Sequence, residues 1–361
     1  MKKKLGIVTI TALENFGNRL QNYALQEVLK NLGFEVETIP NHTVYRYRQS
    51  PFFTLAKKAA SILTHSPKHI SELRRKQAFD AFNKKYIKFS RCYSTNKYIP
   101  KKLNDNYDFF IAGSDQIWNP YYNFNFDLNF LAFADKSKRV AYSASFSVDE
   151  IPREKVSDFN QYLSAIDNIS VREYEGAKII EELTDKKAPV TLDPTLLIDA
   201  EDWRKIAVKP SFISNNEQFI FVYYLGKRDD LEKLKDNVIK EHPEWKSCRI
   251  IDIGLTDNTE IYSVSPDNFL WLTDNASAVI TDSYHGTIFS LIFNTPFVSM
   301  LTKGDSFSMD SRIKTLFKTL DLNVDCGEIA YPEKVLKKEI LDIKRNKALN
   351  YLKGALKINE T

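Results

Sequence analysis

The start of the chain alternates between apolar stretches and amphipathic ones. Residues 5–10 are apolar and rich in β-branched side chains, which predicts a buried strand. After a loop at 11–17, apolar side chains recur every four residues, which predicts a helix capped by Asn18 and ended by Gly33. Residues 34–39 predict a second strand. A strand–helix–strand unit of this kind is typical of a parallel α/β sheet.

The stretch 46–102 interrupts this alternation. Apolar side chains recur at helical spacing over 55–63 and again over 79–89, which predicts two amphipathic helices. Lys and Arg occupy many of the positions between them, so we expect basic outer faces. We interpret the stretch as a basic helical insertion in an α/β domain.

Two further series of strands and helices follow the insertion. In the first, the expected strands are 108–112, 139–146, 169–172 and 190–192, and the expected helices are 152–166 and 173–183. In the second, the expected strands are 219–225, 247–253, 278–281 and 297–301, and the expected helices are 229–241, 266–275, 285–293 and 311–320. A long charged helix is expected over 332–357. The pattern predicts an α/β fold with two Rossmann-like domains that face a cleft.

The domain boundaries follow from the breaks in this pattern. We expect an N-terminal domain over 1–204, a linker over 205–217, a C-terminal domain over 218–330 and a C-terminal helix over 331–361. Ligands of open α/β sheets bind beyond the carboxyl ends of the strands. The loops of interest are therefore 11–17, 113–118, 143–146, 172–175, 192–195 and 282–287.

Composition agrees with this picture. The 361 residues suffice for two domains of about 100–200 residues each. Hydrophobic residues make up 43% and charged residues 27%, which excludes a mostly disordered chain. The three Cys residues are far apart and form no CxxC motif, so we expect no disulfide framework, no zinc site and a reducing compartment. No signal peptide or membrane-spanning run is evident, so we expect a cytoplasmic protein. We assign no residues to a metal site.

Charge is distributed unevenly along the chain. The net charge of the whole chain is +4, yet the insertion at 46–102 holds 15 Lys and Arg residues against 2 acidic ones. Three interpretations are open: a solvated helical face, a nucleic-acid surface, or a surface for anionic membranes. No nucleic-acid-binding motif is present, so we expect no nucleic-acid partner and favour peripheral contact with an anionic membrane surface.

The segment Thr281-Asp-Ser-Tyr-His-Gly-Thr287 joins an expected strand to an expected helix. Ser283 can cap the helix, and Gly286 permits a close approach of the backbone. Free N–H groups at a helix start favour an anion, and His285 could transfer a proton near neutral pH. The alternative is a capped helix with a structural histidine.

Two more loops carry reactive side chains. Arg172 ends an expected strand, where its guanidinium could bind a carboxylate or phosphate, or else pair with Glu173 or Glu175. In the segment 113–118, Asp115 could accept a hydroxyl proton and Gln116 could bind a sugar hydroxyl, or the segment could be an ordinary turn.

Six motifs together make the chain resemble the polysaccharide pyruvyl transferase family. They are Asn15-Phe-Gly-Asn-Arg-Leu-Gln-Asn-Tyr-Ala-Leu-Gln26, Phe110-Ile-Ala-Gly-Ser-Asp-Gln-Ile-Trp-Asn119, Ala141-Tyr-Ser-Ala-Ser-Phe146, Ser170-Val-Arg-Glu173, Leu192-Asp-Pro-Thr195 and Thr281-Asp-Ser-Tyr-His-Gly-Thr287. The motifs occur in the family's order, and the resemblance covers residues 5 to about 320.

The resemblance implies a GT-B-like fold and transfer of pyruvate from phosphoenolpyruvate to two hydroxyls of a surface-polysaccharide sugar or its lipid-linked precursor. It implies that Arg172 binds the donor and that His285 is the general acid. Part of the family carries a second Arg at the position of Ser283, so Arg312 or Lys303 could take over that role here. No cofactor is expected beyond phosphoenolpyruvate as donor substrate. Besides His285 and Asp115 as catalytic residues, the expected substrate-binding residues are Arg172, Ser283, Tyr284, Gly286, Thr287, Asn15, Asn18, Ser114, Gln116 and Arg312.

Two other functions fit the same residues. One is a GT-B glycosyltransferase that uses a nucleotide sugar. The other is a saccharide-binding protein without catalytic activity. This alternative stays open because Ser283 stands where part of the family carries its second Arg.

Overall fold

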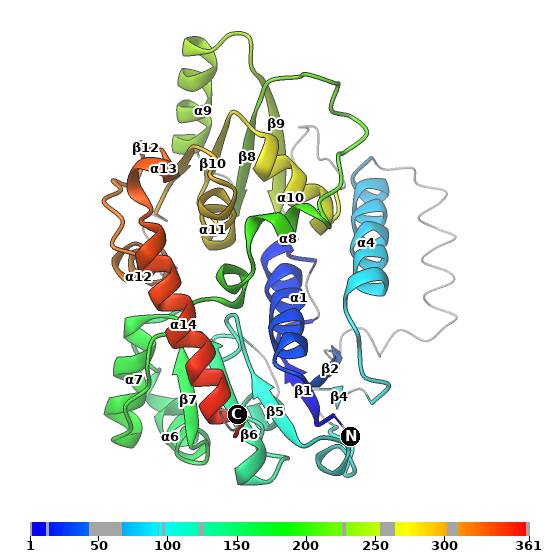
Figure 1. Cartoon of the computed structure of the whole chain (residues 1–361), viewed down its shortest axis with the longest axis vertical. Helices are drawn as coiled ribbons and strands as arrows, with labels where there is room; N and C mark the ends of the chain where they lie inside the picture. The colour runs from blue at the N-terminus through cyan, green and yellow to red at the C-terminus, as the bar shows by residue number, and fades with distance from the viewer. Residues whose placement is uncertain are drawn as a thin grey trace.

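The computed structural model describes residues 2–11, 14–42, 67–92, 94–95, 98–122, 126–225, 229–252, 264–301 and 310–358. Two five-stranded sheets organise the chain (Figure 1). We call the part built on the first sheet the N-terminal lobe and the part built on the second sheet the C-terminal lobe.

The first sheet is entirely parallel, with strand order β2-β1-β5-β6-β7. Its strands are β1 (Lys4–Val8), β2 (Glu35–Thr38), β5 (Phe109–Ala112), β6 (Arg139–Ala144) and β7 (Asn168–Val171). The central strands are buried on both faces, as their apolar runs predict. β6 ends at Ala144, two residues earlier than expected. Within it, the pairing with β7 shifts register between Ala141 and Ala144, and Ser143 takes a left-handed backbone conformation. Val190 forms an isolated bridge to Val171 rather than the expected strand.

Helices of the N-terminal lobe connect these strands. They are α1 (Phe16–Asn31), α5 (Phe126–Asn129), α6 (Val156–Ser164) and α7 (Tyr174–Thr184). α1 begins earlier than the sequence predicts, because Asn15 rather than Asn18 is the cap: the Asn15 side chain accepts a hydrogen bond from the Asn18 N–H at 3.1 Å. Asn18 contributes its backbone N–H to this cap, and its side chain takes no part in it.

The basic insertion is described from residue 67 onward, and the first expected helix, at 55–63, lies outside the described residues. α4 (Pro67–Tyr86) buries Phe79 and Phe82, as its apolar spacing predicts. Phe89 lies beyond the helix, where it bridges to Thr38 at the edge of the sheet; two short strands, β3 (Asn41–His42) and β4 (Ser94–Thr95), pair nearby. The guanidinium of Arg75 lies over the Phe16 and Phe79 rings at 4.7 and 5.0 Å, so not every basic side chain points outward.

The second sheet has the order β12-β11-β10-β8-β9 and is parallel except for β12. Its strands are β8 (Phe219–Leu225), β9 (Lys246–Asp252), β10 (Ala278–Thr281), β11 (Phe297–Ser299) and β12 (Ile329–Ala330). The helices of this lobe are α9 (Asp229–Glu241), α10 (Pro266–Asn275), α11 (Tyr284–Phe293) and α12 (Asp310–Thr319).

The lobes are joined by packing as well as by the chain. Phe16 of α1 stacks on Phe269 of α10 with ring centroids 4.9 Å apart, and Trp203 of α8 (Ala200–Arg204) meets Phe289 of α11 at 5.0 Å. One continuous cluster of buried apolar residues extends through both lobes. Burial of this much apolar surface favours a fixed arrangement of the two lobes.

The C-terminal segment crosses from one lobe to the other (Figure 1). The single helix expected there is two helices, α13 (Pro332–Val335) and α14 (Lys338–Ala355), because Leu336 and Lys337 have extended backbones. α14 returns to the N-terminal lobe, where the Tyr351 hydroxyl donates to the Ala141 carbonyl at 2.8 Å and Arg345 Nε donates to the Leu196 carbonyl at 2.6 Å.

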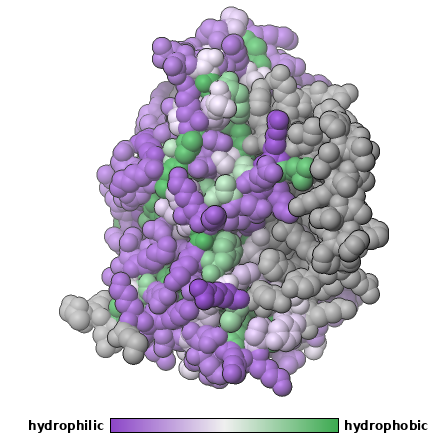
Figure 2. Space-filling view, turned by 90° about the vertical axis from the view of Figure 1, so that its right-hand side faces the viewer, coloured by the Kyte–Doolittle hydropathy of each residue, from purple (hydrophilic) through white to green (hydrophobic). Residues whose placement is uncertain are grey.

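The residues coloured by hydropathy in Figure 2 are mainly hydrophilic, with apolar residues scattered among polar ones. Among the described helices, none has both the length and the hydrophobicity that crossing a bilayer requires.

Candidate active site

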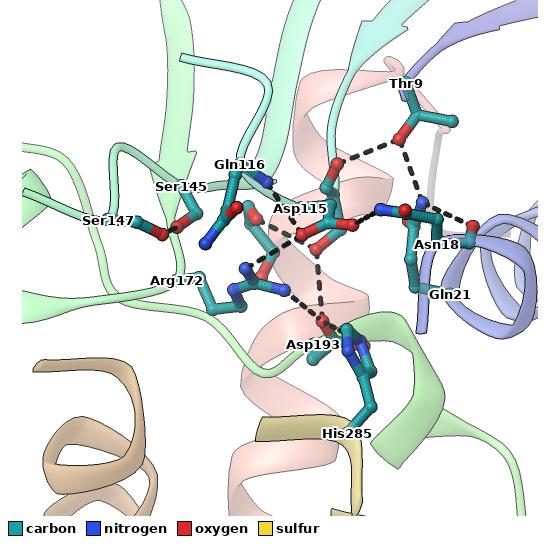
Figure 3. A network of polar contacts seen from close by, with 12 residues as sticks. Thr9, Asn18, Gln21, Asp115, Gln116, Ser145, Ser147, Arg172, Asp193 and His285 are labelled. Atoms are coloured by element: carbon teal, nitrogen blue, oxygen red, sulfur yellow. Dashed lines mark hydrogen bonds and ion pairs between the residues drawn. The ribbon is translucent and has the colours of Figure 1, made fainter. Parts of the chain in front are cut away.

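Loops from the carboxyl ends of strands in both lobes meet at one buried polar network (Figure 3). The N-terminal lobe contributes the loops after β5 and β7, and the C-terminal lobe contributes the start of α11 after β10. We distinguish two parts. The carboxylate cluster consists of Asp115, Arg172, Asp193 and His285. The Arg312 cluster consists of Gln116, Ser145, Ser147 and Arg312.

Arg172 lies at the centre of the carboxylate cluster and its side chain is fully buried. One terminal nitrogen donates to Asp193 Oδ2 at 2.9 Å and the other to Asp115 Oδ1 at 3.3 Å. These partners replace the pairing with Glu173 or Glu175 that was the alternative. Burial lowers the pKa of Arg172, but the charges of Asp115 and Asp193 outweigh burial and raise the pKa above its usual value.

The Asp193 carboxylate accepts four hydrogen bonds. Its Oδ1 accepts hydrogen bonds from the Thr195 N–H at 3.0 Å and the Thr195 hydroxyl at 2.7 Å, and its Oδ2 accepts from Ser114 at 3.2 Å as well as from Arg172. Burial raises the pKa of Asp193, but His285, Arg172 and the Thr195 N–H together lower it well below its usual range. Asp193 is therefore ionised at neutral pH.

Asp115 follows β5 in a left-handed conformation, with φ of 76°. This turn aims its carboxylate back across the sheet edge. Oδ1 accepts from the Gln116 N–H at 2.8 Å, and Oδ2 accepts from the Asn18 side chain. Asn18 thus joins the site through its side chain instead of capping α1.

His285 reaches the cluster from the first turn of α11. Its Nε2 lies 3.5 Å from Asp193 Oδ2, and its side chain is almost fully buried. The ring packs directly on the backbone of Gly17, where a Cβ would lie 2.1 Å from His285 Nδ1. Glycine at position 17 is therefore what lets a histidine of one lobe contact α1 of the other.

Tyr284 lies between two arginines. The Arg172 guanidinium lies 4.6 Å from the centre of its ring and the Arg312 guanidinium 5.6 Å from it. Burial, followed by the charge of Asp193, raises the pKa of the Tyr284 hydroxyl far above its usual value. Tyr284 therefore stays neutral and presents its ring to both cations.

The Arg312 cluster joins α12 of the C-terminal lobe to loops of the N-terminal lobe. With its amide oxygen facing α12, Gln116 accepts hydrogen bonds from the two terminal nitrogens of Arg312 at 2.8 and 3.2 Å and from the Ser147 hydroxyl at 3.0 Å. The Ser145 and Ser147 hydroxyls lie 2.9 Å apart. Glu173 Oε1 supports this turn by accepting from the Ser145 hydroxyl at 3.0 Å and from the N–H groups of Phe146 and Ser147 at 2.7 and 3.1 Å.

Most of the residues expected from the sequence come together here. The network includes His285, Asp115, Arg172, Asn18, Ser114, Gln116, Tyr284 and Arg312. The other four act in the local structure of helix starts. Asn15 caps α1, Ser283 caps α11, Gly286 packs on Thr281, and the Thr287 hydroxyl bonds the Ser283 carbonyl and Ser299. Lys303 lies outside the described residues.

The site also contains residues to which the sequence alone assigns no role. Asp193 follows the expected strand at 190–192 and lies in one of the six motifs, so its position is the available signal. Gly17, Ser145 and Ser147 also lie in loops of interest or near motifs, but nothing in their residue types indicates contacts with His285 or Gln116. No group of three or more His, Cys, Asp or Glu residues suited to a metal ion occurs within the described ranges.

Comparison with solved structures defines the class of fold. S. aureus MnaA in complex with UDP is 12% identical, with a TM-score of 0.50 over 99% of this chain and 98% of that one. The UDP-GlcNAc 2-epimerase of Methanocaldococcus jannaschii in complex with UDP-GlcNAc and UDP is 14% identical, with a TM-score of 0.46 over 97% and 100% of the two chains. The predicted α/β fold of two Rossmann-like domains, GT-B-like in architecture, is confirmed.

The family follows from the sequence model that matches the chain. The model for polysaccharide pyruvyl transferase matches residues 15–303, which include every motif named above. The chain therefore belongs to the polysaccharide pyruvyl transferase family and is a transferase. No curated protein matches the chain.

Proposed function

We propose that this protein transfers the pyruvate moiety of phosphoenolpyruvate to two hydroxyls of a saccharide, forming a cyclic ketal. The observation that carries the proposal is the position of His285, which reaches from one lobe to within 3.5 Å of Asp193 beside the buried Arg172 of the other. This arrangement supplies a proton carrier next to positive charge, which a phosphorylated enol acid requires.

The proposed steps use this chain's residues as follows. His285 gives a proton to C3 of phosphoenolpyruvate, which leaves a cation at C2. A first saccharide hydroxyl forms a C–O bond to C2 and loses its proton to Asp115. The C2–O bond to phosphate then breaks, and a second hydroxyl closes the ring at C2. Asp115 passes the proton of the first hydroxyl to the departing phosphate, and the proton of the second hydroxyl restores His285, so the products are the ketal and inorganic phosphate.

The carboxylates have separate roles in this proposal. Asp193 is ionised and held by Thr195 and Arg172, so it can fix the orientation of the His285 ring. Asp115 is oriented by Asn18 and Arg172. Arg172 and Arg312, on either side of Tyr284, provide the positive charge for an anionic donor.

The test is release of phosphate from phosphoenolpyruvate with a panel of simple hexosides, N-acetylhexosaminides and lipid-linked saccharides. We expect release to require a saccharide and to fall by about 10²–10⁴-fold in His285→Gln. The control is His242→Gln, because His242 is exposed and stacks on Trp245 away from the site. Hydrolysis of UDP-sugars without any phosphoenolpyruvate reaction would favour a glycosyltransferase, and inactivity with all donors would favour a binding protein.

The described part of the basic insertion supports a proposal about where the enzyme binds its saccharide acceptor. Exposed basic side chains gather on α4 and just after it, namely Arg74, Lys76, Lys84, Lys85, Lys88 and Arg91. Contact of this surface with an anionic membrane would bring the enzyme to lipid-linked saccharides on the cytoplasmic side. Co-sedimentation with vesicles containing phosphatidylglycerol should fall in the double variant Lys84→Glu/Lys85→Glu and with added salt, and binding insensitive to both would contradict this role.

A further inference from the structure

One arginine of the basic insertion is attached to the start of α1. Arg75 of α4 donates a hydrogen bond from a terminal nitrogen to the Glu14 carbonyl at 2.7 Å. Its guanidinium also lies 4.7 Å from the centre of the Phe16 ring and 5.0 Å from that of Phe79. Arg75 is half-buried, whereas Arg74 beside it is exposed. Arg75 therefore holds both the residues just before α1 and the first residue of that helix (Figure 1).

Phe16 is held from the C-terminal lobe as well. Its fully buried ring stacks on Phe269 of α10 at 4.9 Å and meets Tyr223 of β8 edge-on at 5.6 Å, while Phe79 of α4 lies 5.3 Å away. The ring thus fills a space whose walls come from the insertion, α10 and β8. Because protein interiors are close-packed, a change at Arg75 is expected to move Phe16 and the first turn of α1 with it.

The next residue along α1, Gly17, contacts the histidine of the candidate site. A Cβ at Gly17 would lie 2.1 Å from Nδ1 and 2.6 Å from Cγ of His285, so the backbone and the ring touch directly. The opposite ring nitrogen, Nε2, lies 3.5 Å from Asp193 Oδ2. The imidazole is therefore placed between the backbone of α1 and a carboxylate. A displacement of the first turn of α1 changes the surface on which the ring packs.

We propose that Arg75 is a positioning residue for His285, on which it acts through the start of α1. The contacts run from the Arg75 guanidinium to Glu14 and Phe16, and from the adjoining Gly17 to the imidazole. The basic insertion thereby has a task besides presenting charge at a surface, since one of its arginines fixes the position of the proton carrier. The inference rests on the proposed function where turnover is measured, and is independent of it where the position of the ring is measured.

The first measurement follows the His285 ring by NMR without any substrate. Imidazole signals of the isotope-labelled full chain are compared in wild type, Arg75→Met, Arg75→Lys and Arg204→Met, and His285→Gln assigns the His285 signals. Arg204 is the matched control because its guanidinium also lies over a phenylalanine ring, that of Phe293 at 5.7 Å. We expect the His285 signals to shift in Arg75→Met, to shift less in Arg75→Lys, which keeps a cation over the ring, and to stay unchanged in Arg204→Met. Unchanged His285 signals in Arg75→Met, or equal shifts in Arg204→Met, would overturn the inference.

The second measurement is phosphate release from phosphoenolpyruvate with a saccharide acceptor. Arg75→Met should lower kcat by about tenfold and leave the KM for phosphoenolpyruvate within about twofold, because a misplaced proton carrier slows the chemical step and not donor binding. In a His285→Gln background the same substitution should have no further effect, since it acts through that ring. Equal losses of turnover in both backgrounds would show a merely structural role and overturn the inference.

Two further outcomes have fixed meanings. If Arg75→Met does not fold, Arg75→Lys takes its place in both measurements, with the same signs and smaller changes. If the His285 signals shift in the Arg75 variant but phosphoenolpyruvate is never consumed by the wild type, the positioning role stands and the proposed function fails.

Discussion

The carboxylate cluster and the Arg312 cluster each contain one buried arginine, yet they differ in charge balance. In the first, Arg172 has two carboxylates and Asp193 accepts four hydrogen bonds. In the second, the two terminal nitrogens of Arg312 bond the neutral Gln116 amide oxygen. The charge of Arg172 is therefore neutralised within its own cluster, whereas that of Arg312 is buried beside a neutral amide.

The two lobes also contribute differently. The N-terminal lobe supplies both carboxylates and Arg172, while the C-terminal lobe supplies His285, Tyr284 and Arg312. Neither lobe alone therefore holds both His285 and Asp193, which lie 3.5 Å apart. The packing of His285 on Gly17 makes the histidine's position depend on the fixed arrangement of the lobes.

The largest expected effect is on the balanced cluster. Arg172→Ala leaves two buried carboxylates without a cation and should lower the free energy of unfolding by about 3–5 kcal/mol. Arg204→Ala, which breaks a partly exposed pair with Asp274, should cost at most about 1 kcal/mol. Urea unfolding of both variants checks the contrast, and equal losses would show that the carboxylate cluster is not a tightly coupled unit.

A substitution at the lobe contact should act on catalysis. Gly17→Ala places a Cβ where His285 Nδ1 now lies, so the ring must move, and turnover should fall by about 10²-fold. A methyl group added at Gly354 of α14 would meet nothing within 4 Å, so Gly354→Ala should leave turnover unchanged. It should also stabilise the helix by about 0.5–1 kcal/mol. Full activity in Gly17→Ala would mean that His285 works from another position.

The low pKa of Asp193 predicts how stability depends on pH. Because folding lowers this pKa, the unfolded chain takes up the proton first as pH falls, and the stability contributed by Asp193 is lost below about pH 4. Asp193→Asn should therefore be less stable than the wild type at pH 7 by about 1–3 kcal/mol, and the gap should narrow toward pH 3. A gap that is constant over this range would show that the charge of Asp193 is not the cause.

The smallest effect is expected at Glu173. Burial raises the pKa of this carboxyl, with Arg172 and the Ser147 N–H acting in the opposite direction, so ionisation costs stability as pH rises above about 4.3. Glu173→Gln keeps an oxygen for the N–H groups of Phe146 and Ser147 and should stay within about 1 kcal/mol of the wild type, gaining on it as pH rises. Glu173→Ala should lose about 1–3 kcal/mol. Thermal unfolding between pH 4 and 8 measures both, and equal behaviour of the two variants would contradict a supporting role for Oε1.

Much of the fold could be predicted from the sequence because it depends on local pattern. The apolar strands 219–225 and 278–281 match β8 and β10, and the polar segment 229–241 matches α9. Errors arose where a distant contact decides the local structure. Asn18 resembles a helix cap in the sequence, but its side chain donates a hydrogen bond to Asp115 instead. The residue that caps the helix is Asn15.

The candidate site was predictable in part for the same reason. Arg172, Asp115 and His285 stand at the carboxyl ends of strands, where ligands of parallel sheets bind. Their partners depend on how the two lobes meet, which no local pattern encodes. Asp193 and Gly17 could therefore be placed near the site by their motifs, while their contacts with His285 required the structure.

The central claim is that His285 protonates C3 of phosphoenolpyruvate. The direct measurement is the reaction in D₂O with the saccharide that supports phosphate release, followed by NMR of the ketal methyl group. We expect a methyl group carrying one deuterium, one phosphate per ketal, and ketal formation slowed by about 10²–10⁴-fold in His285→Gln but not in His242→Gln. A methyl group without solvent deuterium, or a His285→Gln rate within about tenfold of the wild type, would contradict it.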